Sequence, residues 1–187
     1  RGGQGSLPLS LELLPGAELL AGLQRLYAPA CEERGIRLET VASGGVVEAD
    51  RTLLSRALAN LLDNAIRFTP DRGSIRVEAA PTPGGLSIRV CDSGRGIPAA
   101  ARELVFERFA RLDPTRSGPG TGLGLPIARM IARVHGGELW VADSPLGGAC
   151  LSMRLPLREP APEPGGDSRP ESAPLLPATG SYEEGVR

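Results

Sequence analysis

The chain has 187 residues, a length that suits one domain with a tail, and its 41% hydrophobic content excludes a wholly disordered protein. No apolar run approaches about 20 residues, so we expect no direct membrane insertion by this chain. A net charge of −1 and only 3% aromatic residues argue against a nucleic-acid partner, because such proteins use basic and aromatic surfaces.

The first third of the chain predicts two strands and two helices. Alternating leucines over residues 7–13 predict a strand. Apolar residues at helical spacing over residues 16–35 predict an amphipathic helix, and residues 36–41 predict a short strand. Asp50 is a suitable N-cap for a second helix over residues 51–68.

Two β-hairpins are predicted further along. Alternating apolar residues at 75–79 and 86–90 flank a Pro- and Gly-rich turn, and those at 139–142 and 149–155 flank a second turn.

The segment between the hairpins predicts a short helix, a loop and a longer helix. The short helix begins near Pro98 and ends around Phe106 and Phe109. Residues 111–122 lack periodicity and predict a mobile loop, and a helix is expected over residues 123–134.

This order of elements predicts an α+β fold, a two-layer sandwich in which a mixed β-sheet is covered on one face by helices. Residues 158–187 hold six of the 18 prolines among Glu, Ser and Gly, which predicts a disordered tail. We expect one domain over residues 7–157, with residues 1–6 as a disordered start or the end of a linker. The missing initial Met indicates a piece of a longer protein.

The cysteines and the histidine exclude familiar metal sites. Cys31, Cys91 and Cys150 are odd in number and far apart, so we expect reduced, buried thiols in a cytoplasmic protein. His135 is the only histidine. It ends a predicted helix before two glycines, where we expect it to interact with the helix terminus.

A polar stripe follows the helix predicted over residues 51–68. Asn60, Asn64 and Arg67 share one face at spacings of four and three residues. Asparagine is a poor helix former, so two asparagines on one helix face indicate a role other than forming the helix. Amide oxygens suit Mg²⁺ and a guanidinium suits phosphate, whereas a solvated helix face is the alternative.

A glycine-rich loop follows the first hairpin. Asp92 ends a strand, where its carboxylate can accept a hydrogen bond from an exocyclic amino group such as that of adenine. Gly94 and Gly96 allow the backbone to approach a flat ligand closely. A tight turn closed by an Asx hydrogen bond is the alternative.

A second glycine run, Gly120-Thr-Gly122-Leu-Gly124, precedes the helix predicted over residues 123–134. Free N–H groups at a helix N-terminus bind phosphate. No strand precedes the run and the chain has no lysine, which excludes a dinucleotide fingerprint and a P-loop. Phe106 and Phe109 are expected to be core residues that anchor the base of the loop that follows them, which can act as a lid.

In this order and at these spacings, the four segments resemble the N box, first glycine box, F box and second glycine box of the ATP-binding catalytic domain of sensor histidine kinases. The resemblance covers residues 7–157 and implies the Bergerat fold, shared with type II topoisomerases, mismatch-repair ATPases and chaperone ATPases. It implies a protein histidine kinase that binds ATP and Mg²⁺ and transfers the γ-phosphate to a histidine on a dimerisation hairpin. No such hairpin is present in this sequence. The resemblance implies that it belongs to the same parent protein, which can be anchored in the inner membrane, and that a response regulator receiver domain is the next partner.

Residue by residue, the resemblance implies that Asn64 binds Mg²⁺ and that Asn60 and Arg67 act with it at the phosphates. It implies that Asp92 accepts a hydrogen bond from adenine, and that Arg111 or Arg116 contacts phosphate when the lid, residues 110–119, closes. The remaining implied nucleotide-binding residues are Phe68, Gly94, Gly96, Ile97, Phe109, Arg111, Gly120, Thr121, Gly122, Leu123, Gly124 and Leu125.

Position 60 separates branches of this superfamily. The topoisomerase and mismatch-repair ATPases carry a glutamate there, four residues before the metal-binding asparagine, as a general base for water. Asn60 cannot take a proton at neutral pH, so we expect poor ATP hydrolysis and an acceptor other than water. The alternatives are a Bergerat-type ATPase clamp, which measurable turnover would favour, and a non-catalytic regulatory module that binds nucleotide or nothing, which a failure to bind ATP would favour.

Overall fold

A mixed sheet of five strands forms the centre of the molecule. The computed structural model describes residues 9–110 and 122–157. The strand order is β2-β4-β5-β7-β6, with β2 Arg37–Ala42, β4 Ser74–Thr82, β5 Gly85–Asp92, β7 Ala149–Pro156 and β6 Glu138–Asp143. Only β2 and β4 are parallel; the other neighbours are antiparallel.

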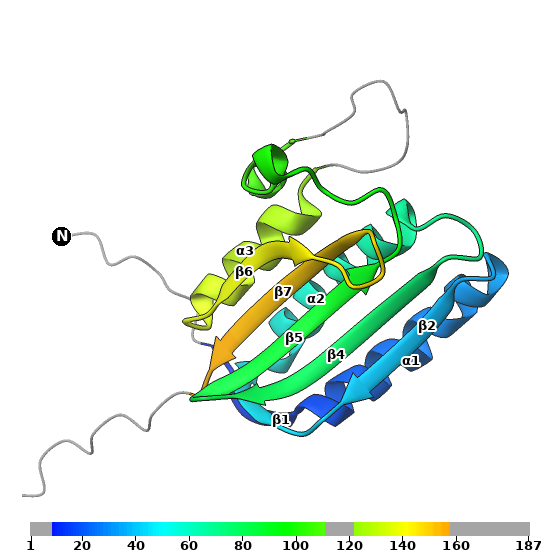
Figure 1. The fold of residues 1–187 in the computed structure, drawn as a ribbon. Coiled ribbons are helices and arrows are strands. Elements are labelled where there is room, and N and C mark those ends of the chain that lie inside the picture. The colour runs from blue at the N-terminus through cyan, green and yellow to red at the C-terminus, as the bar shows by residue number, and fades with distance from the viewer. Residues whose placement is uncertain (1–8, 111–121, 158–187) are drawn as a thin grey trace, which may run out of the picture.

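Three α-helices cover one face of this sheet (Figure 1): α1 Gly16–Glu33, α2 Arg51–Phe68 and α3 Gly124–Val134. Helix α2 carries an apolar stripe that is buried in full, Leu54, Leu58, Leu61, Leu62 and Ala65, and alternate residues of the central strands pack against it. The predicted α+β sandwich is therefore confirmed. The largest fully buried side chains of this core are Leu54, Leu58, Leu61, Leu62, Ile75, Leu86, Ile88, Leu139, Leu151, Met153 and Leu155. No helix within the described ranges is long and apolar enough to cross a membrane.

A small second sheet precedes α2. Strand β1, Leu11–Pro15, pairs antiparallel with β3, Val46–Asp50, with Leu14 opposite Val47. The sequence predicted the first strand with an earlier start and did not predict β3. Its five residues carry no strong local signal, and the strand exists because β1, distant in the sequence, supplies its partner.

The predicted short helix after Pro98 is replaced by two 3₁₀ turns, η1 at Ala99–Ala101 and η2 at Leu104–Phe106. Phe106 is buried as expected, but Phe109 is 70% exposed, so the prediction that Phe109 is a core residue is wrong. Phe109 has a φ of 65°, and its N–H donates to the Gly122 carbonyl at 3.1 Å. Its backbone, rather than its ring, therefore closes the base of the lid segment.

The start of α2 is fixed by a cap and by the only histidine. The Asp50 carboxylate accepts a hydrogen bond from the Leu53 N–H at 3.0 Å, and this bond lowers the pKa of Asp50. The Asp50 N–H donates to His135 Nε2 at 3.0 Å, so Nδ1 carries the proton and donates to the Ile131 carbonyl at 2.8 Å. The predicted helix-terminus role of His135 is confirmed, and its ring also joins the end of α3 to the start of α2.

The end of α2 is fixed by Arg34. Its Nη1 donates to the Ile66 carbonyl at 2.5 Å, its Nη2 to the Thr69 carbonyl at 2.8 Å and its Nε to Asp71 Oδ1 at 2.9 Å. Carbonyls at a helix C-terminus lack partners within the helix, so one guanidinium satisfies two of them. The last turn of α2, with Arg67 and Phe68, is held in place by these bonds.

Cys91 and Cys150 form a disulfide, while Cys31 is free and buried. The expectation of reduced thiols is therefore wrong for Cys91 and Cys150. They lie directly opposite each other on β5 and β7, although 59 residues separate them in the sequence. Spacing along the chain cannot reveal such a pair, because strand register brings it together.

Replacing Arg34 by Ala should lower the free energy of unfolding by about 1–3 kcal/mol, because the α2 carbonyls lose charged donors. Arg37→Ala is the control, since Arg37 is exposed and its side chain makes no hydrogen bond within the described structure. Urea denaturation followed by circular dichroism measures both variants. Equal stability of the two would show that Arg34 does not hold the end of α2.

Candidate functional site

Three of the sequence motifs meet at the carboxyl end of β5. A Cβ on Gly94, in the loop after β5, would lie 2.4 Å from the Phe68 carbonyl oxygen at the end of α2. A Cβ on Gly124, at the start of α3, would lie 3.6 Å from Asn60 Oδ1 in the middle of α2. The polar face of α2 thus lies between the two glycine segments.

The Asp92 side chain is only 3% exposed. Oδ1 accepts hydrogen bonds from the Gly94 N–H at 2.8 Å and the Ala149 N–H at 3.1 Å. Both hydrogen bonds that the described residues make to this carboxyl group end on Oδ1, which leaves Oδ2 for a ligand donor. The bond from Gly94 is the predicted Asx interaction, so the turn interpretation and the ligand interpretation hold together.

The turn between β6 and β7 holds Asp92 from the other side. Ser144 Oγ donates to the Asp92 carbonyl at 2.7 Å, and the Gly148 N–H donates to the same oxygen at 3.1 Å. A Cβ on Gly148 would lie 2.2 Å from Asp92 Oδ1, so only glycine fits there. The sequence predicted this turn only as a hairpin connection. Its paired glycines were the one signal that another backbone approaches closely.

Burial is the main cause of a raised Asp92 pKa, and the hydrogen bonds from Ala149 and Gly94 oppose it. The folded state therefore keeps a proton at a pH where the unfolded chain has lost it. Stability then falls as pH rises from the ordinary aspartate range through the raised pKa. The ionised carboxylate is a group that the fold destabilises and a ligand donor would stabilise.

Asp92→Asn should raise the urea midpoint at neutral pH, because the amide keeps the Oδ1 acceptor and removes the buried charge. The difference from the unsubstituted chain should shrink as pH is lowered toward the ordinary aspartate range. Asp143→Asn, at an 89% exposed side chain, is the control and should change little. A lower midpoint for Asp92→Asn at neutral pH would contradict this account of the site.

Asn60 presents an unsatisfied donor. Its Nδ2 is buried and has no hydrogen-bond partner among the described residues. Beside it, α3 begins at Gly124 without a side-chain cap at Leu123 and with no acidic residue in its first turn. A buried donor next to uncapped helix N–H groups fits an anion such as phosphate, and the solvated-face alternative fails for Asn60.

Asn64 lies half-buried one turn after Asn60. Within the described ranges, no group of three or more His, Cys, Asp or Glu residues could hold a metal ion. Mg²⁺ commonly binds through one or two protein oxygens, with phosphate oxygens and water completing its shell. A single amide oxygen at Asn64 fits that arrangement.

Two guanidinium groups lie over the Phe68 ring at the end of α2. Cζ of Arg95 is 4.9 Å and Cζ of Arg67 is 5.4 Å from the ring centroid. Cation–π contacts of this kind orient the exposed guanidinium groups beside the site. Phe68 therefore supports positive charge as well as packing.

The other predicted residues differ in what they offer. Ile97 packs against the core and Leu125 is 9% exposed, so their side chains belong to the fold. Gly96 and Gly122 have φ of 72° and 69°, in the left-handed region that glycine favours. Arg111, Arg116, Gly120 and Thr121 lie outside the described residues.

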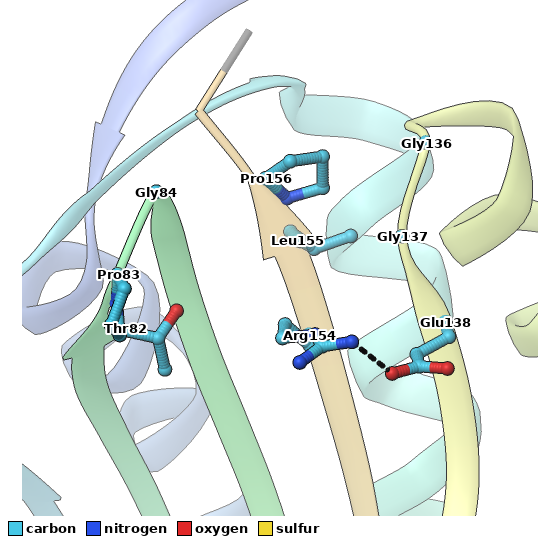
Figure 2. A pocket seen from close by; sticks show the side chains of 9 residues that line it. All are labelled: Thr82, Pro83, Gly84, Gly136, Gly137, Glu138, Arg154, Leu155 and Pro156. Carbon is cyan, nitrogen blue, oxygen red and sulfur yellow. Dashed lines mark hydrogen bonds and ion pairs between the residues drawn. The ribbon is translucent and has the colours of Figure 1, made fainter.

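A separate pocket of about 330 Å³ lies at the opposite end of the sheet (Figure 2). The turn after β4, the residues before β6 and the end of β7 line it, and an Arg154–Glu138 ion pair of 2.6 Å crosses it. None of the predicted site residues lines this pocket.

Comparison with known proteins identifies the family of the chain. Residues 49–159, more than half of the chain, match the family described as histidine kinase-, DNA gyrase B- and HSP90-like ATPases. The chain belongs to this family. It corresponds to the ATP-binding catalytic domain of sensor histidine kinases, as its relatives indicate.

The sensor protein IrlS of Burkholderia pseudomallei is 42% identical over 138 residues, covering 73% of this chain and 29% of IrlS. The sensor protein KdpD of Escherichia coli is 33% identical over 159 residues, covering 85% of this chain and 18% of KdpD. The chain thus spans less than a third of these relatives.

Solved structures give the same fold. The catalytic domain of histidine kinase ThkA superposes with a TM-score of 0.71 at 28% identity, covering 79% of this chain and 96% of that domain. The mycobacterial sensor histidine kinase MprB gives a TM-score of 0.66 at 33% identity, covering 78% of this chain and 97% of that structure.

Proposed function

We propose that this catalytic domain binds Mg-ATP and transfers the γ-phosphate to a histidine on a dimerisation hairpin of its parent protein. The observation that carries the proposal is a buried amide N–H of Asn60 without a partner among the described residues, together with a buried Asp92 carboxylate whose two hydrogen bonds from those residues both end on Oδ1. The Asp92 carboxylate lies at the end of β5, and the Asn60 amide lies on α2 beside the start of α3. An adenine amino group and a phosphate oxygen supply partners for these two groups.

Each residue has a separate task in this proposal. Asp92 Oδ2 accepts from the adenine amino group, while Gly94 and Gly96 admit the flat base. Asn60 Nδ2 donates to phosphate, and Asn64 supplies the protein oxygen for Mg²⁺. When bound, the metal neutralises charge on the phosphates, and catalysis is then mostly positioning.

Asn60 also determines the acceptor in this proposal. A neutral amide cannot remove a proton from water, so the site holds no general base at this position. The phosphoryl group is therefore reserved for a stronger nucleophile, the imidazole of a histidine. The ATPase clamp is disfavoured for the same reason.

The partners follow from this chemistry. The phosphohistidine passes its phosphoryl group to an aspartate of a response regulator receiver domain. The nucleotide supply places the reaction in the cytoplasm, where a membrane anchor elsewhere in the parent protein would hold it at the inner membrane.

Asn64→Ala should weaken ATP binding by roughly 10-fold in the presence of Mg²⁺ and much less in its absence, because only the metal contact is lost. Asp92→Asn should weaken binding in both conditions. Calorimetric titration measures the dissociation constants, with Ser55→Ala, an exposed position of α2, as the control. A folded chain that binds no ATP would favour a regulatory module without nucleotide.

Transfer should be seen when the chain, ATP labelled in the γ-phosphate and a purified dimerisation hairpin of a sensor histidine kinase are mixed. The expected label on the hairpin is stable to alkali and labile to acid, as phosphohistidine is. Release of free phosphate by the chain alone should be slow. Rapid release without labelling of the hairpin would instead identify an ATPase clamp.

A further inference from the structure

We propose that the Cys91–Cys150 disulfide positions the Asp92 carboxylate, so that reducing it weakens the binding of adenine nucleotides. The inference rests on the function proposed above, because it concerns the same nucleotide site. It assigns to a cysteine pair outside the four motifs a control over the affinity of that site.

Each cysteine of the disulfide is the chain neighbour of one partner in the hydrogen bond between Ala149 and the Asp92 carboxylate. Cys91 directly precedes Asp92, and Cys150 directly follows Ala149, whose N–H donates to Asp92 Oδ1 at 3.1 Å. Gly148, one residue further, donates to the Asp92 carbonyl at 3.1 Å. The covalent bond therefore fixes the start of β7 against the end of β5, where the carboxylate takes its donors.

The pairing of β5 with β7 ends at the disulfide. Paired residues of β5 and β7 run from Gly85 opposite Pro156 to Cys91 opposite Cys150, which is the last pair. Beyond that pair, β5 and β7 contact each other through the hydrogen bonds of Asp92 with Ala149 and with the β6–β7 turn, while β4 pairs with Asp92 and β6 pairs with Ala149 on the outer sides. Loss of the disulfide therefore removes the covalent link nearest to these hydrogen bonds, and the donors of Asp92 can shift relative to the carboxylate.

The disulfide lies on the sheet face away from the helices. Val90 and Leu151, the neighbours of Cys91 and Cys150 along their strands, belong to the main core, whereas neither cysteine does. Successive side chains of a strand point to opposite faces. Figure 1 shows the α-helices on the other side of the sheet. Both cysteines are fully buried, so only side chains of the outer face need to move for a reductant to reach them.

The chemical step balances with a dithiol as the reductant. The S–S bond breaks, two electrons and two protons arrive, and two thiols form, while the dithiol is oxidised to its own disulfide. Disulfides in the cytoplasm are typically transient or redox-sensing. In the cytoplasm, where we propose that the reaction takes place, the fraction of chain with the disulfide formed would follow the thiol–disulfide balance of that compartment.

The test compares nucleotide binding by the oxidised and the dithiothreitol-reduced full chain. Alkylation and mass spectrometry assign the states, because the oxidised chain exposes only Cys31 to the reagent after denaturation. Reduction should raise the dissociation constant of ATP by about 3- to 10-fold, as expected for a misplaced hydrogen bond. Reoxidation should restore the original value.

Inosine triphosphate separates positioning from a general loss of structure. It carries a carbonyl where adenine carries the amino group, so it offers no exocyclic donor to Asp92. Its affinity should change by less than about twofold on reduction, since no bond to this carboxylate is lost. An equal loss for both nucleotides would show a merely structural disulfide and would overturn the proposal.

Two variants complete the design. Cys91→Ser combined with Cys150→Ser should bind ATP with the affinity of the reduced chain, whatever the redox conditions. Cys31→Ser is the matched control and should keep the full response to dithiothreitol. If the double variant fails to fold, the reversible reduction of the unsubstituted chain still decides the question.

The outcomes separate the two proposals. Equal ATP affinity before and after reduction, or a chain whose Cys91 and Cys150 stay alkylatable under oxidising conditions, would overturn the role of the disulfide and leave the kinase proposal standing. Failure of the folded, oxidised chain to bind any ATP would overturn both.

Discussion

The site depends on one buried carboxylate whose place is set by the backbone of two distant segments. Asp92 ends the central strand β5, where the sheet gives it no cation. The Gly94 N–H comes from its own loop, and the Ala149 N–H comes from the start of β7. Two neutral donors on one oxygen offset part of the cost of burial, and the described residues donate no hydrogen bond to the other oxygen. The raised pKa of Asp92 expresses this imbalance, and a ligand amino group would relieve it.

The same principle explains how the phosphate end of the site is built. Asn60 lies in the middle of α2, where its amide meets the start of α3 and has no partner from the described residues. Burying a donor without a partner is unfavourable in a resting protein. The buried Asp92 carboxylate and the buried Asn60 amide each lower the free energy of unfolding. A nucleotide that pairs with both groups recovers that loss.

The sequence predicted what local signals encode. The bounds of α2 follow from its Asp50 cap and its apolar stripe, and the predicted hairpins and their strands are confirmed because alternation is a local pattern. The family followed from four ordered motifs. Strand β3 was missed because its partner β1 creates it. The position of Phe109 was wrong because hydrophobicity does not reveal a positive φ.

The missed parts of the site share one cause. Ser144, Gly148 and the Cys91–Cys150 pair all depend on the register of β5 against β7, which no local pattern encodes. The β6–β7 turn looked like an ordinary connection in the sequence, yet it supplies two donors to the Asp92 carbonyl, and the first residue of β7 after it supplies a donor to the Asp92 side chain. Its paired glycines indicated a close backbone approach but did not indicate which segment approaches.

The bond from the Phe109 N–H to the Gly122 carbonyl gives the lid segment a common base. Because this bond joins the two ends of the segment, a change in the segment's length need not move the residues on either side of it. The entropy of closing such a loop grows only slowly with the number of residues in it. Insertions and deletions between Phe109 and Gly122 should therefore leave the sheet, α2 and the Asp92 carboxylate in place.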